Sequence, residues 1–239
     1  MSNVAKGIEE KTLKTLSEVI EEEIPQGNVA VLSGPSHAEE VGRGLPTTCV
    51  VSAHTQETAE YLQSIFYEPC VSCIYNTRYP WSGTWRSPEK CDRTGSGYCG
   101  WSWIWGQYQG GTDHQRNHRD RKTWQKKMGA QMETFYGLSG IGDLIVTCAS
   151  KHSRNRKAGY LIGQGHTMEE AMDEVQMVVE GVYSARAARE LAEKYEVEMP
   201  IITEVNRVLF EGKSAAEAVM DLMLRDKKVE TPMLPWENI

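Results

Sequence analysis

A stretch of fifty residues in the middle of the chain lacks nearly all the side chains that build a protein core. Between Tyr75 and Trp124 there is one isoleucine, Ile104, and no leucine, valine, methionine, alanine or phenylalanine. The same stretch holds six of the seven tryptophans of the chain, at positions 81, 85, 101, 103, 105 and 124. Its residues follow neither a helical nor a strand period. The folded core must therefore come from the flanks, and the stretch is either an inserted aromatic module or a sequence read out of frame.

The composition is that of a globular protein. Of the 239 residues, 40% are hydrophobic and 25% are charged, and the formal net charge is −7. A negative chain is not built mainly to hold nucleic acid or an anionic membrane. No run approaches the roughly eighteen apolar residues of a membrane span, and the N-terminus has no apolar signal-peptide core. We therefore expect a cytoplasmic protein with no nucleic-acid partner and no membrane insertion.

The N-terminal flank alternates strand and helix patterns. Residues 3–7 are typical of the end of a strand, and residues 8–23 form an amphipathic pattern that predicts a helix. The apolar run 29–32 predicts a buried parallel strand. Ser36 is expected to cap the next helix in a capping box with Glu39. A second β-branched run, 47–52, and a helix over 55–67 complete the order. This β-α-β-α order favours part of a doubly wound sheet that lacks its first half.

The C-terminal flank carries helix signals only. Ser153 is expected to open a basic helix that ends near Gly163 and Gly165. Capping boxes begin at Thr167 and at Ser214, each with a glutamate three residues later. Helices are also expected over 182–195 and 201–210. The chain beyond residue 126 therefore reads as all-α.

Ordered motifs on both flanks resemble those of the bacterial NAD(P)-dependent sn-glycerol-3-phosphate dehydrogenases. They are AKGIE at 5–9, SGPSHAEEV at 33–41, GLPT at 44–47, GLSGIGDL at 137–144, SRNR at 153–156, VVEGV at 178–182 and EMPI at 198–201. The resemblance covers residues 3–70 and 126–228. It implies an α/β plus all-α fold, in which the C-terminal part of a Rossmann-type sheet precedes a helical domain. It also implies that about a hundred residues, including the Gly-rich dinucleotide turn, lie upstream of this sequence.

The tryptophans support the out-of-frame reading. Tryptophan has a single codon, TGG, so its last two bases give glycine when the frame is displaced. All six tryptophans of the stretch then become glycine, where the family has glycine. Residues 71–124 can be reread in that frame as a family-like, Ala- and Ile-rich sequence. We therefore predict one frameshift near Cys70 and a compensating one near Gln125. The expected domains are 1–76 (partial NAD(P)-binding domain), 77–125 (out-of-frame segment) and 126–239 (helical substrate-binding domain).

The resemblance also implies roles for individual residues. Substrate-binding residues are expected at Lys6, Gly34, Ser36, Asp143, Ser153, Arg154 and Asn155. Cofactor-binding residues are expected at Lys6, Ala38, Arg154, Val178 and Glu180. Without the resemblance, these residues read as a loop lysine, helix caps, a basic helix start, a core valine and a surface glutamate. His37 stands where many relatives carry an aromatic residue, and we assign it no catalytic role.

The implied reaction is hydride transfer between NAD or NADP and C2 of glycerol 3-phosphate or dihydroxyacetone phosphate, feeding glycerophospholipid synthesis. A lysine with a lowered pKa exchanges the proton in that family. Its position is occupied here by Glu89, so no catalytic residue is intact and we expect the printed chain to be inactive. The sequence does not distinguish NAD from NADP, and a homodimer is possible.

The competing hypothesis is a non-enzymatic binding protein with an insert at 71–124. The Trp101–Trp105 run could stack on sugars or bases. Cysteines 70, 73, 91 and 99 with histidines 114 and 118 could bind zinc, but their Cys and His pairs are too far apart for a compact finger. The basic run 116–122 reads as a solvated surface. We expect no metal site.

Overall fold

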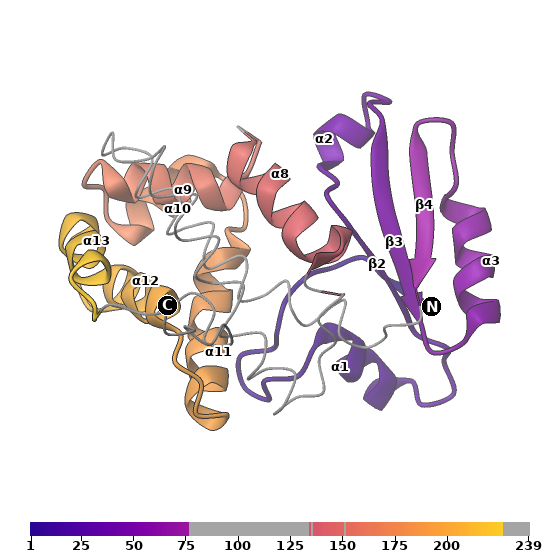
Figure 1. Ribbon diagram of the computed structural model, residues 1–239, viewed down its shortest axis with the longest axis horizontal. Coiled ribbons are helices and arrows are strands. Elements are labelled where there is room, and N and C mark those ends of the chain that lie inside the picture. Colours follow the sequence, from indigo (N-terminus) through magenta and orange to yellow (C-terminus); the bar gives the residue numbers. More distant parts are fainter. Residues whose placement is uncertain (77–133, 135, 151, 227–239) are drawn as a thin grey trace, which may run out of the picture.

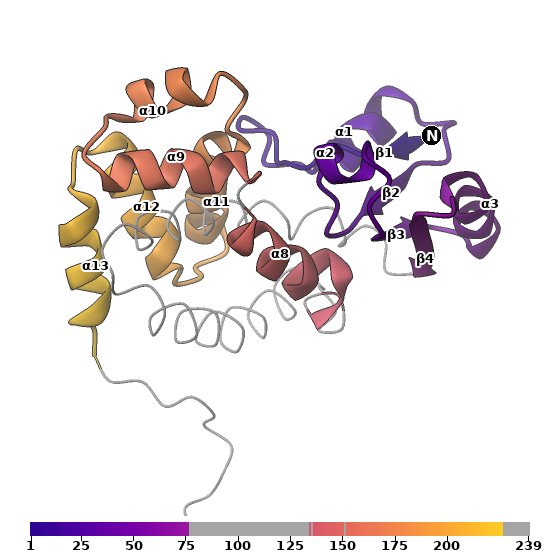
Figure 2. The same ribbon diagram turned by 90° about the horizontal axis from the view of Figure 1, so that it is seen from above.

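The computed structural model describes residues 1–76, 134, 136–150 and 152–226. These residues form a part that contains a β-sheet and a part made of helices, placed side by side (Figure 1). The helix α8 (Asp143–Ala149) lies between the two parts in both views (Figures 1 and 2). Segments from both parts can therefore contribute to one site.

The sheet has four strands in the order β1-β2-β3-β4. They are β1 (Ser2–Asn3), β2 (Ala30–Ser33), β3 (Thr47–Ala53) and β4 (Val71–Asn76). Helix α3 (Gln56–Phe66) packs on the sheet and buries Ala59 and Leu62 against Ala30, Cys49, Val51, Ala53 and Cys73. Thr55 caps α3 by accepting a hydrogen bond from the N–H of Thr58, which confirms the helix expected over 55–67. Of the tryptophan-rich stretch, the structure describes Tyr75 and Asn76, which end β4, and β4 pairs in parallel with β3.

The polarity of the sheet differs from the expected parallel arrangement. Strands β1 and β2 are parallel, and so are β3 and β4, but β2 and β3 are antiparallel. The connection from β2 to β3 contains only the four-residue helix α2 (Ala38–Val41). Parallel neighbours need a crossover that travels the length of the sheet and is usually a full helix. So short a helix does not carry the chain back, and β3 returns beside β2 in the opposite direction.

The first predicted helix is shorter than its pattern suggested. Helix α1 spans Leu16–Glu23, and Thr15 and Glu18 form its capping box. Residues 8–15 instead make a turn in which Ile8 bridges to Thr15 and Leu13 has a positive φ of 59°. Ile8 is buried in the core of the helical part and Leu13 packs against that core, whereas Ile20 of α1 packs on Val29 and Val31 of the sheet part. One amphipathic pattern therefore serves two cores, and a single straight helix could not reach both.

The helical part is arranged around one long central helix, α11 (Glu180–Lys194). Its neighbours include α9 (Arg154–Gly163) and α12 (Pro200–Phe210). Helix α10 (Met168–Val175) packs on α9, and α13 (Ala215–Met223) packs on α12 and α9. Alanines 185, 187 and 188 of α11 are fully buried, which lets neighbouring backbones approach closely. A π-helical turn, η1 (Leu138–Gly142), precedes α8 and packs on β3.

Most predicted helix starts of this part are confirmed, whereas α11 begins at Glu180, two residues before the helix predicted over 182–195. Ser153 caps α9, and capping boxes begin α10 at Thr167 and α13 at Ser214. Pro200 occupies the first turn of α12, where its missing N–H costs nothing. The described residues thus confirm the expected class of a Rossmann-type α/β sheet followed by a helical domain.

Candidate functional site

A cavity of about 260 Å³ lies where the sheet part meets the helical part. Four segments line it: residues 4–6 after β1, 36–39 at the start of α2, 152–155 at the start of α9, and 177–180 at the start of α11. Eight of the ten residues selected from the sequence lie on this lining. They are Lys6, Ser36, Ala38, Ser153, Arg154, Asn155, Val178 and Glu180.

The ninth selected residue, Asp143, reaches the cavity wall through Lys6. The Lys6 Nζ donates a hydrogen bond to Asp143 Oδ2 at 3.2 Å. Asp143 is 1% exposed at the start of α8, and the Lys6 side chain is 21% exposed. A buried carboxylate must be paired because its desolvation is costly. The pair therefore fixes the lysine of the sheet part against the helix that lies between the two parts.

The start of α9 uses its polar side chains in three different ways. Ser153 is 4% exposed, and its hydroxyl accepts the N–H of Arg156 as the helix cap. Asn155 is 8% exposed, and its Oδ1 accepts the N–H of Gly181 at 2.9 Å, which joins the starts of α9 and α11. Arg154 is exposed and donates to the Val178 carbonyl at 3.4 Å. A guanidinium has five N–H donors, so this long hydrogen bond leaves most of them for a ligand.

The start of α2 corrects the predicted cap. The cap residue is His37, one residue after Ser36, and it makes no side-chain cap hydrogen bond. The Ser36 hydroxyl faces Gly34 instead, at 3.5 Å from the Gly34 carbonyl oxygen, and the Ser36 N–H donates to the same carbonyl at 2.8 Å. This tight turn after β2 shifts the helix start by one residue. The Ser36 side chain is consequently exposed on the cavity lining.

Gly34, the tenth selected residue, lies behind this turn and not on the lining. It has a φ of +143°, and a Cβ at this position would come within 2.8 Å of the Cys49 Cα and 2.9 Å of the Thr48 carbonyl oxygen. Both contacts are with the backbone of β3, which cannot move aside. The structure therefore requires glycine here for the close approach of two strands.

The segments that line the cavity fit one end of a nicotinamide cofactor. Ala38, Met177 and Val178 supply apolar surface, and Arg154 supplies a cation beside them. Such a lining suits a flat ring with a nearby phosphate. Within the described ranges there is no Gly-rich turn of the kind that cradles a dinucleotide pyrophosphate. The fit therefore covers the reactive end of the cofactor only.

The structure adds four lining residues that carried no expected role: His37, Glu39, His152 and Met177. Each is an immediate neighbour of a selected residue in the same motif. Their position next to selected residues in the sequence could therefore have identified them. Two of the four are histidines, which gain charge in the physiological pH range.

Several expectations fall outside the residues that the structure describes. These are the position of Glu89, the tryptophan run at 101–105, and Cys91, Cys99, His114 and His118 of the zinc hypothesis. Of the remaining two cysteines of that hypothesis, Cys70 is exposed and Cys73 is buried beside Cys49. Burial, followed by the neighbouring Cys49, raises the pKa of the Cys73 thiol to about 12, which disfavours the thiolate that binds metal.

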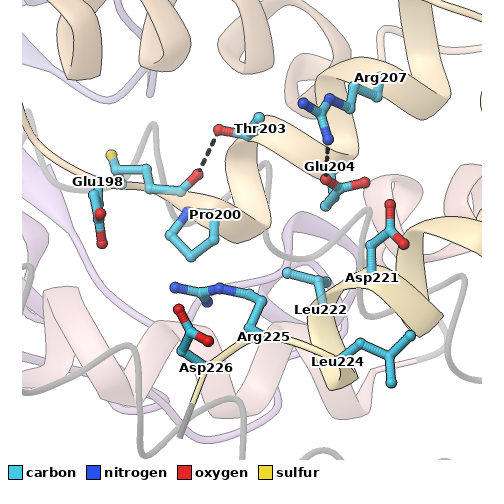
Figure 3. A pocket seen from close by; sticks show the side chains of 11 residues that line it. Glu198, Pro200, Thr203, Glu204, Arg207, Asp221, Leu222, Leu224, Arg225 and Asp226 are labelled. Carbon is cyan, nitrogen blue, oxygen red and sulfur yellow. Dashed lines mark hydrogen bonds and ion pairs between the residues drawn. The ribbon is translucent and has the colours of Figure 1, made fainter. Parts of the chain in front are cut away.

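A larger cavity, of about 580 Å³, lies between α12 and α13 and collects none of the selected residues (Figure 3). Three of its charged lining residues, Glu204, Arg207 and Asp221, are in ion pairs. Glu204 pairs with Arg207 and Lys213, and Lys213 also pairs with Asp221. These pairs hold α12, the following loop and α13 together. We therefore place the candidate site at the smaller cavity, where the motifs selected on the two flanks meet.

None of the helices within the described ranges is long and apolar enough to cross a membrane.

Comparison with known proteins gives matches on both flanks. Residues 1–59 match the family described as NAD-dependent glycerol-3-phosphate dehydrogenase N-terminus, and residues 116–220 match the corresponding C-terminus. The two matches leave residues 60–115 outside both, and this range contains most of the tryptophan-rich stretch.

Curated relatives match over nearly the whole chain. The glycerol-3-phosphate dehydrogenase (NAD(P)+) of Agathobacter rectalis is 53% identical over 234 residues, which cover 98% of this chain and 69% of that protein. The enzyme of the same name from Fusobacterium nucleatum is 52% identical over 230 residues, covering 95% and 68%. Among solved structures, glycerol-3-phosphate dehydrogenase from Coxiella burnetii superposes with a TM-score of 0.88 at 27% identity, covering 94% of this chain and 68% of that one.

Proposed function

This chain belongs to the NAD(P)-dependent glycerol-3-phosphate dehydrogenases, and we propose that its cavity between the sheet and α9 is where the three-carbon phosphate ester and the nicotinamide meet. The observation that carries the proposal is the gathering of residues 6, 36–38, 153–155, 178 and 180 on one lining. These segments are distant in sequence, and the fold alone brings them together. The family substrates are glycerol 3-phosphate and dihydroxyacetone phosphate.

Arg154 is the residue best suited to hold the phosphate. It lies at the start of α9, where a helix N-terminus also favours an anion. Its guanidinium can donate two parallel hydrogen bonds to phosphate oxygens. Ser36 and Asn155 add polar groups on the same lining. The Asn155 Oδ1 is held by Gly181, so its NH₂ group is the part available to a ligand.

Lys6 and Asp143 are suited to orient the substrate hydroxyl groups. Lys6 lines the cavity and can donate to a substrate hydroxyl, and Asp143 behind it fixes the position of the Lys6 ammonium group. Ala38, Val178 and Glu180 would line the nicotinamide side. The bound nicotinamide supplies or accepts the hydride at substrate C2, and the residues named here position the two reactants.

We propose that this chain binds the substrate but turns it over slowly. By resemblance, the lysine that exchanges the proton falls at Glu89, which brings a negative charge where a phosphate ester should bind. General acid–base catalysis contributes on the order of 10²–10⁴ in rate. Loss of that lysine therefore predicts a chain whose turnover is at least this far below that of a complete family member. The domain boundaries at 76 and 126 and the frameshifts near Cys70 and Gln125 are part of the same proposal.

Binding and turnover should be measured separately. Titration calorimetry of the purified chain with glycerol 3-phosphate is expected to give saturable binding that dihydroxyacetone phosphate competes away and glycerol does not. NAD and NADP reduction with the same substrate should stay near the blank rate. A folded chain that binds no phosphate ester would overturn the site assignment, and turnover at a family-like rate would overturn the proposed inactivity. Sequencing the gene across codons 70 and 125 tests the frameshifts directly.

Two finer expectations accompany this function. A cytoplasmic location was expected from the sequence, which left a homodimer open, and we propose both. Sedimentation of the purified chain at several concentrations would test the homodimer, and fractionation of the source cells would test the location.

A further inference from the structure

Among the lining residues that the structure describes, the permanent charges cancel. Lys6 and Arg154 contribute two cations, and Glu39 and Glu180 contribute two carboxylates. Asp143, behind Lys6, adds a further negative charge that is ion-paired with that lysine. With neutral histidines, this set of side chains is therefore slightly unfavourable to a dianionic phosphate group.

Two histidines on the same lining can reverse this balance. His37 comes from the start of α2 in the sheet part, and His152 comes from the turn before α9 in the helical part. Histidine gains a positive charge as the pH falls from about 8 to about 5. With both histidines protonated, the described lining residues and Asp143 together carry a net positive charge.

We propose that His37 and His152 determine how strongly the cavity holds a phosphate group, because anion binding there is coupled to proton uptake by this pair. The inference rests on the proposed function, since it concerns the same cavity and the same anionic group. It adds two specificity-determining residues, one from each part of the molecule. In the described part of the chain, the other charged groups on the lining are Lys6, Glu39, Arg154 and Glu180, with Asp143 behind Lys6. None of these side-chain types changes its usual charge between about pH 8 and about pH 6.

The probe should keep its own charge constant. Sulfate is dianionic throughout this range, whereas a phosphate ester changes from a dianion to a monoanion as the pH falls through its second pKa of about 6. We expect sulfate affinity to rise about three- to tenfold between pH 8 and pH 6, as an added positive charge a few ångströms from a dianion in a partly solvated site predicts. Calorimetry in buffers of different ionisation enthalpy should show proton uptake on binding.

Variants identify the residues responsible. His37→Gln and His152→Gln should each reduce the pH dependence of sulfate affinity and the proton uptake, and the double variant should remove most of both. His166→Gln is the matched control, because His166 is an exposed histidine at the opposite end of α9. It should leave the pH dependence and the proton uptake unchanged.

The outcomes separate the two proposals. If sulfate binds with equal affinity at both pH values, or if the double variant keeps the pH dependence, the histidine inference is wrong and the site assignment stands. If the folded chain binds neither sulfate nor glycerol 3-phosphate at any pH, both are wrong. Circular dichroism of each variant at both pH values confirms that the proteins compared are folded.

Discussion

At the scale of single residues, the site combines side chains with a structural task and side chains that are available to a ligand. The Ser153 hydroxyl and the Asn155 Oδ1 are both engaged by backbone N–H groups. Lys6 is anchored to Asp143. Arg154, by contrast, is exposed and makes one long hydrogen bond to a carbonyl. Among the selected residues it is thus the one whose replacement should affect binding with the least effect on folding.

Replacing Arg154 should weaken phosphate-ester binding without unfolding the protein. Arg154→Ala removes charge-assisted hydrogen bonds worth roughly 1.5–3 kcal/mol, so the dissociation constant for glycerol 3-phosphate should rise about 10- to 150-fold. Arg154→Lys keeps the charge but loses the bidentate geometry. Its dissociation constant should lie between those of the unaltered chain and the Arg154→Ala variant. Titration calorimetry measures each constant.

The control for that series is Arg189→Ala. Arg189 pairs with Glu193 and Glu211 in the helical part and does not line the cavity. It should leave the dissociation constant unchanged. Equal binding by the Arg154→Ala variant and the unaltered chain would remove Arg154 from the proposed phosphate site.

At the scale of elements, the cavity depends on how the starts of α9 and α11 are held together. The hydrogen bond from the Gly181 N–H to Asn155 Oδ1 joins these two starts. Gly181 is buried in the first turn of α11, where its N–H has no partner within the helix. The Asn155 side chain therefore satisfies a backbone group and also sets the spacing of the two segments that carry Arg154 and Glu180.

Two substitutions of Asn155 should separate its structural task from its binding task. Asn155→Ala leaves the buried Gly181 N–H without an acceptor, which should cost about 1–3 kcal/mol of unfolding free energy. Asn155→Asp keeps an acceptor oxygen at a helix start, where a carboxylate is tolerated, and should retain more of that stability. It also places a negative charge beside the anion, so glycerol 3-phosphate affinity should fall at least as much as in Asn155→Ala.

Urea denaturation and calorimetry of both variants make this comparison. If Asn155→Asp were as destabilised as Asn155→Ala, the hydrogen bond to Gly181 would not be what holds the two helix starts. Unchanged affinity in both variants would place Asn155 outside the phosphate site.

At the scale of the whole molecule, the two parts respond differently to pH because their titratable groups differ. The sheet part buries two thiols on adjacent strands, Cys49 and Cys73. Burial raises the pKa of each, and that of Cys73 reaches about 12 from an ordinary value of 9.0. In the helical part, the Lys213 network links α12 to α13 and raises the pKa of Lys213 through its hydrogen bonds to Asp221 and Glu204.

The buried thiols predict alkaline loss of stability. Above pH 9.0 the unfolded chain releases the Cys73 proton, whereas the folded chain keeps it until about pH 12. Stability from this group is therefore complete below pH 9.0 and is lost as the pH rises toward 12. The urea midpoint should fall between about pH 8 and about pH 10.5, and Cys73→Ala should make that fall smaller.

Cys70→Ser is the control, because Cys70 is a free and exposed cysteine. Its urea midpoint should fall with pH as steeply as that of the unaltered chain. An equally steep fall in Cys73→Ala would show that another group governs alkaline stability.

Much of the local structure could be predicted because it depends on contacts within a few residues. Thr55, Ser153, Thr167 and Ser214 each cap a helix through a hydrogen bond from a backbone N–H three residues later. The apolar runs at 29–32 and 47–52 became β2 and β3. Ser36 failed as a cap because the turn after Gly34 shifts the helix start by one residue, so that His37 takes the cap position.

The sequence by itself determined the family, the fold class and most of the motifs that line the candidate site. Only the tertiary structure decided the antiparallel pairing of β2 and β3, the docking of Ile8 on the helical core, the burial of Asp143 behind Lys6, and the presence of His37 and His152 on one lining with Arg154. The physical reason is the range of the interactions involved. Helix caps and helical periods depend on residues that are close in sequence. Strand polarity, burial and cavity charge instead arise from groups up to 137 residues apart, which the packing of the two parts brings together.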